Sequence, residues 1–167
     1  RRTGMIEAPF VLYDEDLRKI QAVIGRLVRD AQSKGIFVVD KNGQLLAEAG
    51  ELRGIDTTSL ASLTAGNIAA TGGLAKLLGE EEFPIHFHQG QRDNLHISMV
   101  GGRVILVIVF DERSSLGLVR LRVKRATAEL AHVFEEMRKK SERAQAAGTA
   151  SPFVEITDED IDNLFAE

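Results

Sequence analysis

The chain of 167 residues contains no cysteine. A disulfide framework and a zinc site built from thiolates are therefore excluded. This absence is typical of proteins from a reducing compartment, so we expect the protein in the cytoplasm. The longest apolar run covers residues 104–110, far short of the roughly 20 residues that cross a bilayer, so we expect no membrane insertion.

The motifs of several common enzyme classes are missing as well. The chain has no GxxxxGK(S/T) phosphate-binding loop, no GxSxG nucleophile motif and no HExxH zinc motif. Tyr13, Ser114 and Ser115 stand in no pattern that indicates catalysis. We therefore predict that the chain is not an enzyme, that it neither binds nor cleaves a nucleotide itself, and that it needs no cofactor.

Negative charge is concentrated at the C-terminus. The net charge is −4, and residues 151–167 carry six acidic residues but no lysine or arginine. The rest of the chain contains the other 19 of the 25 acidic residues and all 21 basic residues, so it is nearly neutral. An acidic segment on a neutral domain indicates a contact with a partner. The same balance gives no support for nucleic-acid binding.

Apolar periodicity predicts the first half of the fold. A helix should begin at the acidic residues 14–16, because apolar residues then recur at spacings of three and four up to Ala31. Strands are predicted at residues 36–39 and 44–49, joined by a tight turn in which Asn42-Gly43 supplies the positive φ. A second helix should follow, with N-cap candidates at Asp56, Thr57 and Thr58, and reach residue 79.

The second half is predicted to add three strands and a long helix. The strands cover residues 83–88, 95–100 and 103–110, and the last is the most apolar, so we expect it at the centre of the sheet. Apolar residues from Leu116 to Met137 keep helical spacing, and the basic residues 138–140 suit a helix end. The order α-β-β-α-β-β-β-α predicts an α+β sandwich with a five-stranded antiparallel sheet.

The second helix is apolar on two sides, so one side should contact something beyond its own sheet. We predict that leucines form the core side together with Ala70: Leu60, Leu63, Leu74, Leu77 and Leu78. Small residues occupy the other side, and two of them are glycines, each of which costs a helix about 0.5–1 kcal/mol relative to alanine. Packing between two copies alone would explain them. We favour a surface that serves both a dimer and a partner.

The C-terminal segment alternates apolar and acidic residues. Residues 141–152 are rich in Ala, Gly, Gln and Ser, which predicts a flexible linker. Thr157 is a candidate N-cap, and Ile161, Leu164 and Phe165 fall on one face of the short helix that follows. Such a helix is marginal alone in water and should fold in a partner's groove. We divide the chain into an N-terminal extension (1–11, with residues 1–4 ahead of Met5 as an expression remnant), a domain (12–140), the linker (141–152) and an acidic tail (153–167).

Five sequence segments carry a resemblance to a known family. They are VDKNGQL at 39–45, DTTSLASLTAGN at 56–67, GGLAKL at 72–77, SLGLVR at 115–120 and IDNLF at 161–165. With the predicted order of elements, they resemble the roadblock/LC7 family, whose fold is profilin-like, and within it the bacterial members of cell-polarity and gliding-motility systems. The strand-turn-strand segment is common to many roadblock proteins, whereas the second-helix segment together with the tail is specific.

The resemblance implies a homodimer that activates a Ras-like small GTPase of the MglA type. Two copies would engage one GTPase and orient its own catalytic residues without an arginine finger, the tail would favour nucleotide exchange, and the protein would be enriched at a cell pole. The second helices of the dimer would form the platform, with Ile68 and Phe83 in the dimer interface. The implied GTPase contacts are Ala61, Ala65, Ala69, Gly72, Gly73, Lys76, Phe153, Ile156, Ile161, Leu164 and Phe165.

Two other residue types are candidate sites. His86 and His88 alternate on one strand, with His96 on the next, which would suit a metal ion, but further ligands are not evident and a solvent-facing surface is the favoured interpretation. Turns carry arginines of the kind that could act as fingers: Arg53, Arg92, Arg103 and Arg113. We interpret these arginines as ordinary solvated surface.

Two alternative functions compete with GTPase activation. One is a roadblock scaffold that binds a GTPase or a motor complex without accelerating hydrolysis. The other is a small-molecule binding module. An acidic tail adapted to one partner favours the GTPase regulator over both.

Overall fold

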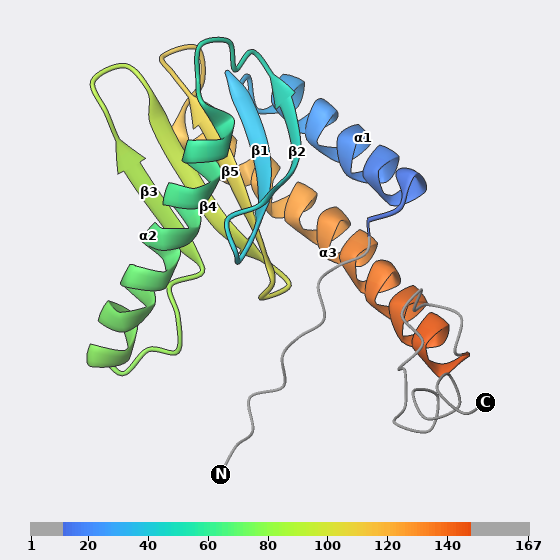
Figure 1. The fold of residues 1–167 in the computed structure, drawn as a ribbon. Helices are drawn as coiled ribbons and strands as arrows, with labels where there is room; N and C mark the ends of the chain where they lie inside the picture. The colour runs from blue at the N-terminus through green and yellow to red at the C-terminus, as the bar shows by residue number, and fades with distance from the viewer. Residues whose placement is uncertain (1–11, 148–167) are drawn as a thin grey trace, which may run out of the picture. The chain divides into compact units, whose positions relative to one another are not determined.

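The structure, a computed structural model, describes residues 12–147 and contains the predicted elements in the predicted order (Figure 1). The helices are α1 (Asp14–Asp30), α2 (Thr57–Leu77) and α3 (Leu116–Ala146). The strands are β1 (Gly35–Asp40), β2 (Leu45–Gly50), β3 (Ile85–Gln89), β4 (Asn94–Val100) and β5 (Val104–Phe110). Contacts divide the chain into one compact unit of residues 12–135 and a second that includes residues 136–147, the end of α3 and one further residue.

The five strands form one antiparallel sheet in the order β2-β1-β5-β4-β3. As predicted, the most apolar strand is central, and all seven residues of β5 are buried. The β1–β2 register shifts between Val38 and Val39, which marks an irregularity in the ladder. The strand order leaves β2 and β3 as the two edge strands of the sheet.

Alternation along the strands gives the sheet two apolar faces. One face contributes Phe37, Ile97 and Val107 to a buried cluster that also contains residues of α2. The opposite face carries Ile36, which pairs with Ile108, and it is covered by α1 and the first half of α3 (Figure 1). The domain thus has three layers, with α2 alone on one side of the sheet.

The structure reverses the predicted sides of α2. The small residues Ala61 and Ala65 belong to the buried cluster with the sheet, whereas four of the five leucines are exposed. Only Leu60 packs against the core as predicted, and Ala70 is exposed. The reason is distance, because small side chains let the backbone of α2 lie close to the strands and the β1–β2 turn, where leucines would hold it away.

Several element ends differ from prediction, most of them by one or two residues, and two of the differences have a clear physical cause. β3 begins at Ile85 rather than residue 83, because Pro84 has no N–H to donate to a ladder. α3 continues to Ala146, six residues into the range predicted as a linker. Good helix formers occupy five of those six positions, and Arg138 and Glu142 form an i,i+4 ion pair across the predicted end. Residues 148–152, the tail and the N-terminal extension lie outside the described residues.

Within residues 12–147, no helix combines the length and the apolar character that a bilayer span requires.

Candidate protein-interaction surface

The start of α2 is fixed by Asp56, one of the three predicted N-caps. The backbone N–H of Ser59 donates to Asp56 Oδ1 at 3.1 Å, and the Ser59 hydroxyl donates to Oδ2 at 2.6 Å. Both hydrogen bonds lower the pKa of Asp56, and the bond from the Ser59 hydroxyl has the larger effect. The cap sets where the helix begins and hence which residues face the sheet.

The inner side of α2 is closed by the domain itself. Ala61 is fully buried, and Ala65 is nearly so. Thr64, on the same side, donates its hydroxyl to the Leu60 carbonyl at 2.7 Å, so its buried polar group is paired within the helix. Ala61 and Ala65 were predicted to contact a GTPase, but they are core residues here, and we leave them out of the candidate surface.

The outer side of α2 is an apolar surface open to solvent. Leu63 is 73% exposed and Leu77 is 83% exposed, and Leu74 and Leu78 are also more than half exposed. We call these four residues the leucine face. Exposed leucines gathered on one helix are unusual for a surface that stays in water, and such patches mark interaction sites. Sequence periodicity found these leucines but placed them in the core.

The other predicted contacts on α2 lie beyond the buried cluster. Ala69, Gly73 and Lys76 are exposed, and Gly72 is half-buried. A β-carbon added to Gly72 or Gly73 would meet no atom within 4 Å, so the described residues do not require glycine there. The space beside both glycines remains open to the backbone of another molecule.

The two predicted dimer residues are each half-buried. Ile68 packs against the buried cluster, so part of its side chain is already used by the domain. Phe83 precedes β3, and its ring lies edge-on to His86 at 6.3 Å between centroids. Neither is fully exposed; Ile68 lies on α2, and Phe83 precedes the edge strand β3.

The edge strand β3 is apolar on the side away from α2. Ile85 is 54% exposed, and Phe87 is 36% exposed although its ring stacks on Phe110 at 6.2 Å. Within residues 12–147, β3 pairs with β4 alone and leaves its other edge without a strand. An apolar edge of this kind is prone to pair with another chain.

The histidines do not converge. His86 pairs with Ile97 and so shares the α2 side of the sheet, whereas His96 pairs with Phe87 and Ile108 on the opposite side. Among residues 12–147, no three His, Asp or Glu side chains are grouped as a metal ion would need. The sequence did not reveal that His96 is buried with no hydrogen-bond partner at either ring nitrogen within the described residues. Burial lowers the pKa of His96, and the positive charge of Arg120 lowers it further.

The four candidate finger arginines differ in their surroundings. Arg113 is held by Asp111, whose carboxylate accepts from its Nε at 3.0 Å and from Nη2 at 3.1 Å. This pair raises the pKa of Arg113 and lowers that of Asp111. Arg53 and Arg92 are exposed, and Arg103 is half-buried.

Comparisons with known proteins agree with this fold. The model of the Roadblock/LC7 domain matches residues 19–110. The structure of Myxococcus xanthus MglB is similar over 76% of this chain and 96% of that one, with 60% identity and a TM-score of 0.73. The structure of the gliding protein mglB of Thermus thermophilus matches over 78% of this chain and 99% of that one, with 38% identity and a TM-score of 0.73.

A Schizosaccharomyces pombe profilin shares the fold alone. It is 13% identical over 68% of this chain and 97% of its own, with a TM-score of 0.51. No curated protein sequence matches the chain.

Proposed function

Because the chain belongs to the Roadblock/LC7 family, we propose that it is a homodimeric regulator of a Ras-like small GTPase of the MglA type and not an enzyme itself. The observation that carries the proposal is the 60% identity to Myxococcus xanthus MglB over nearly all of that chain. Two copies bind one GTPase, accelerate GTP hydrolysis and leave the chemistry to the GTPase's own residues.

The leucine face supports a protein partner. Its four leucines cover the outer side of a helix whose inner side is already packed on the sheet. Burying such side chains contributes roughly 1.5–3 kcal/mol each, which is ample for a specific contact. Ala69 and Gly73 are small and exposed, so they would let a partner's backbone approach α2 closely beside Leu74 and Leu77.

The apolar edge of β3 supports a second copy of the chain as a further partner. Pairing of two β3 edges would satisfy the unpaired backbone groups and cover Ile85 and Phe87 in one step. A two-fold axis would then place the same patch on both copies, as in most homodimers. The two α2 helices would together form the platform for one GTPase.

The proposal also includes a role for the acidic tail and a location of the dimer in the cell. Residues 153–167 contact a separate groove of the GTPase through Phe153, Ile156, Ile161, Leu164 and Phe165, and this contact promotes nucleotide exchange. The dimer is enriched at one cell pole, as a regulator of polarity would be.

A single-turnover assay tests the function. The GTPase is loaded with GTP, and hydrolysis is followed with and without this protein. We expect a clear acceleration that saturates at two copies per GTPase. Binding without acceleration would contradict activation and favour a scaffold, and no binding at all would contradict both.

Variants of α2 test the surface. Ala69→Arg with Gly73→Arg places two long cations one turn apart on exposed positions and should abolish GTPase binding without unfolding the domain. Gln21→Arg, on an exposed position of α1, is the control and should bind as the wild type does. A folded, dimeric double variant that still stimulates hydrolysis would show that the contact lies elsewhere.

A further inference from the structure

The two flanks of α2 face different edges of the sheet. The β1–β2 turn lies against one flank, where Gly43 of the turn closely approaches the backbone of Ser62. The strand order β2-β1-β5-β4-β3 places that turn at the margin of the sheet opposite to β3. The flank of α2 that carries Ser62 therefore faces away from β3, and the other flank faces towards it.

The flank towards β3 carries two of the exposed leucines. Successive residues of an α-helix are rotated by about 100°, so Thr71 lies about 180° around the helix axis from Ser62. Leu74 lies about 120° and Leu78 about 160° from Ser62 by the same rotation. We call Thr71, Leu74 and Leu78 the β3 flank. Both of its leucines are more than half exposed, and Thr71 is half-buried.

The rest of the outer surface of α2 points away from β3. Gly73 lies only about 20° from Ser62, and Leu77 lies about 60° from it. Both are exposed, and Leu77 is the most exposed of the four leucines. One step along the chain, from 73 to 74 or from 77 to 78, therefore leads from this surface to the β3 flank.

Pairing of two β3 edges would bring the two β3 flanks together. When the same edge strand of two copies pairs in antiparallel fashion, one sheet continues into the other. α2 then lies on the same face of the continuous sheet in both copies. The β3 flanks of the two helices face each other across the two-fold axis, whereas the surface with Gly73 and Leu77 stays open.

The charge of α2 suits such a contact. A surface at a two-fold axis meets a copy of itself, so a charge there meets a charge of the same sign. Residues 57–75 contain no charged residue, and Lys76 lies about 40° from Ser62, on the flank away from β3. The Thr71 hydroxyl donates to the Asn67 carbonyl at 2.9 Å, so it needs no partner outside the helix. The β3 flank is therefore neutral, as a self-complementary contact requires.

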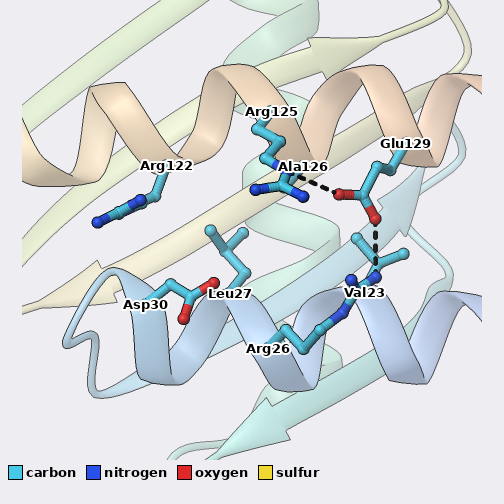
Figure 2. Close-up of a pocket in the computed structure, with 8 residues that line it drawn as sticks. All are labelled: Val23, Arg26, Leu27, Asp30, Arg122, Arg125, Ala126 and Glu129. Carbon is cyan, nitrogen blue, oxygen red and sulfur yellow. Dashed lines mark hydrogen bonds and ion pairs between the residues drawn. The ribbon is translucent and has the colours of Figure 1, made fainter.

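The layer on the other face of the sheet is charged instead. Figure 2 shows the hollow between α1 and α3, where Arg26 and Arg125 share the carboxylate of Glu129 at 2.7 Å and 3.4 Å. Arg122 lines the same hollow. A two-fold contact there would bring like charges together, so the charge pattern favours α2 as the surface that a second copy covers.

We propose that the two sides of α2 bind different partners. The β3 flank, with Thr71, Leu74 and Leu78, packs against the β3 flank of a second copy. The GTPase contacts the rest of the outer surface, including Gly73 and Leu77. This division rests on the proposed homodimer and GTPase, and it adds which side of the leucine face each partner covers.

Adjacent residues provide matched variants of the full-length protein. Leu78→Glu is compared with Leu77→Glu, and Leu74→Glu with Gly73→Glu, because each pair introduces the same carboxylate on the two sides of α2. In sedimentation equilibrium without GTPase, Leu74→Glu and Leu78→Glu should raise the dimer dissociation constant at least about tenfold, since like charges would meet across the axis. Gly73→Glu and Leu77→Glu should stay within about twofold of the wild type. Each pair decides independently, so one unfolded variant leaves the other pair as the test.

The GTPase side is tested with the variants that keep the dimer. With a GTPase of the MglA type bound to a GTP analogue that is not hydrolysed, Gly73→Glu and Leu77→Glu should raise the Kd at least about tenfold. Equal effects on dimerisation within each pair, the reverse order, or wild-type affinity for the GTPase in both variants would overturn the division. Circular dichroism verifies the fold of every variant.

Failure of the division is distinguishable from failure of the proposed function. A wild-type protein that is monomeric, or that does not bind the GTPase, would contradict the proposed function and the division together. A dimeric, GTPase-binding wild type whose matched variants behave alike would contradict the division alone.

Discussion

A β-carbon built on Gly43 would lie 3.1 Å from the Cα of Ser62, so the β1–β2 turn and α2 pack more closely than most residues with a side chain allow. Gly43 also has a positive φ of 87°, which L-residues rarely adopt. The turn holds α2 against the sheet at the point where its small residues are buried. The orientation of the leucine face therefore depends on a residue that is outside α2.

Gly43→Ala should lower the free energy of unfolding by about 2–3 kcal/mol, because it combines backbone strain with a clash against α2. The control is Gly54→Ala, which has a similar positive φ of 79° but no atom within 4 Å of the added carbon. It should cost only the strain, about 1–2 kcal/mol. Denaturant unfolding measures both, and equal losses would argue against the turn–helix contact.

Leu77→Glu should weaken dimerisation or GTPase binding while the domain stays folded. Leu77 is largely exposed, so the domain core loses little, whereas an interface would have to bury a carboxylate. Leu121→Glu is the matched control, because Leu121 is 64% exposed on α3. Sedimentation equilibrium and binding assays compare them, and the same loss in both variants would refute a special role for the leucine face.

His96 should make stability depend on pH. Burial lowers its pKa below the ordinary 6.5, so as the pH falls from about 6.5 the unfolded chain takes up a proton that the folded chain does not. Stability should therefore decrease over that range, and the contribution is absent above it. His96→Leu should remove this pH dependence, whereas the exposed His88→Leu should retain it. The midpoints of urea unfolding, measured between pH 5 and pH 8 for the wild type and both variants, show whether His96 causes the pH dependence.

The sequence predicted the order of elements and the central place of β5, because apolar periods of two and of three to four residues report local structure directly. It failed on α2, since both sides of that helix are apolar and periodicity cannot say which side meets the sheet. That side is set by contacts with other parts of the chain, such as the packing of Ala61 and Ala65 on the sheet and the close approach of Gly43 to Ser62. The burial of His96 was equally out of reach, because strand alternation does not tell which helix covers a face.

No single arginine should act as a finger on the GTPase. Removal of a true finger costs about 10³–10⁵ in the hydrolysis rate. We expect much smaller losses from each of Arg53→Ala, Arg92→Ala, Arg103→Ala and Arg113→Ala in single-turnover assays. A loss of that size at one of them, with binding preserved, would replace the proposed mechanism by a finger mechanism.

Deletion of residues 153–167 should separate the two effects on the GTPase. Burial of Ile161, Leu164 and Phe165 could return roughly 1.5–3 kcal/mol each, offset in part by the cost of ordering the segment. The truncated protein should remain a folded dimer, bind the GTPase less tightly and retain some activation of hydrolysis, but lose any stimulation of exchange. Unchanged exchange rates would contradict the proposed role of the tail, and an unfolded product would make it part of the domain.

Because β1 pairs with β5, the sheet can form only late in the synthesis of the chain. Val38 lies beside Leu106, so the centre of the sheet cannot close until most of the domain has been translated. α2 leaves the ribosome before β5 does, and for seconds, at about 5–20 residues per second, both of its apolar sides are uncovered. A slower translation of residues 78–110 would therefore lengthen the time during which the inner side of α2 lacks its sheet, and with it the exposure to aggregation.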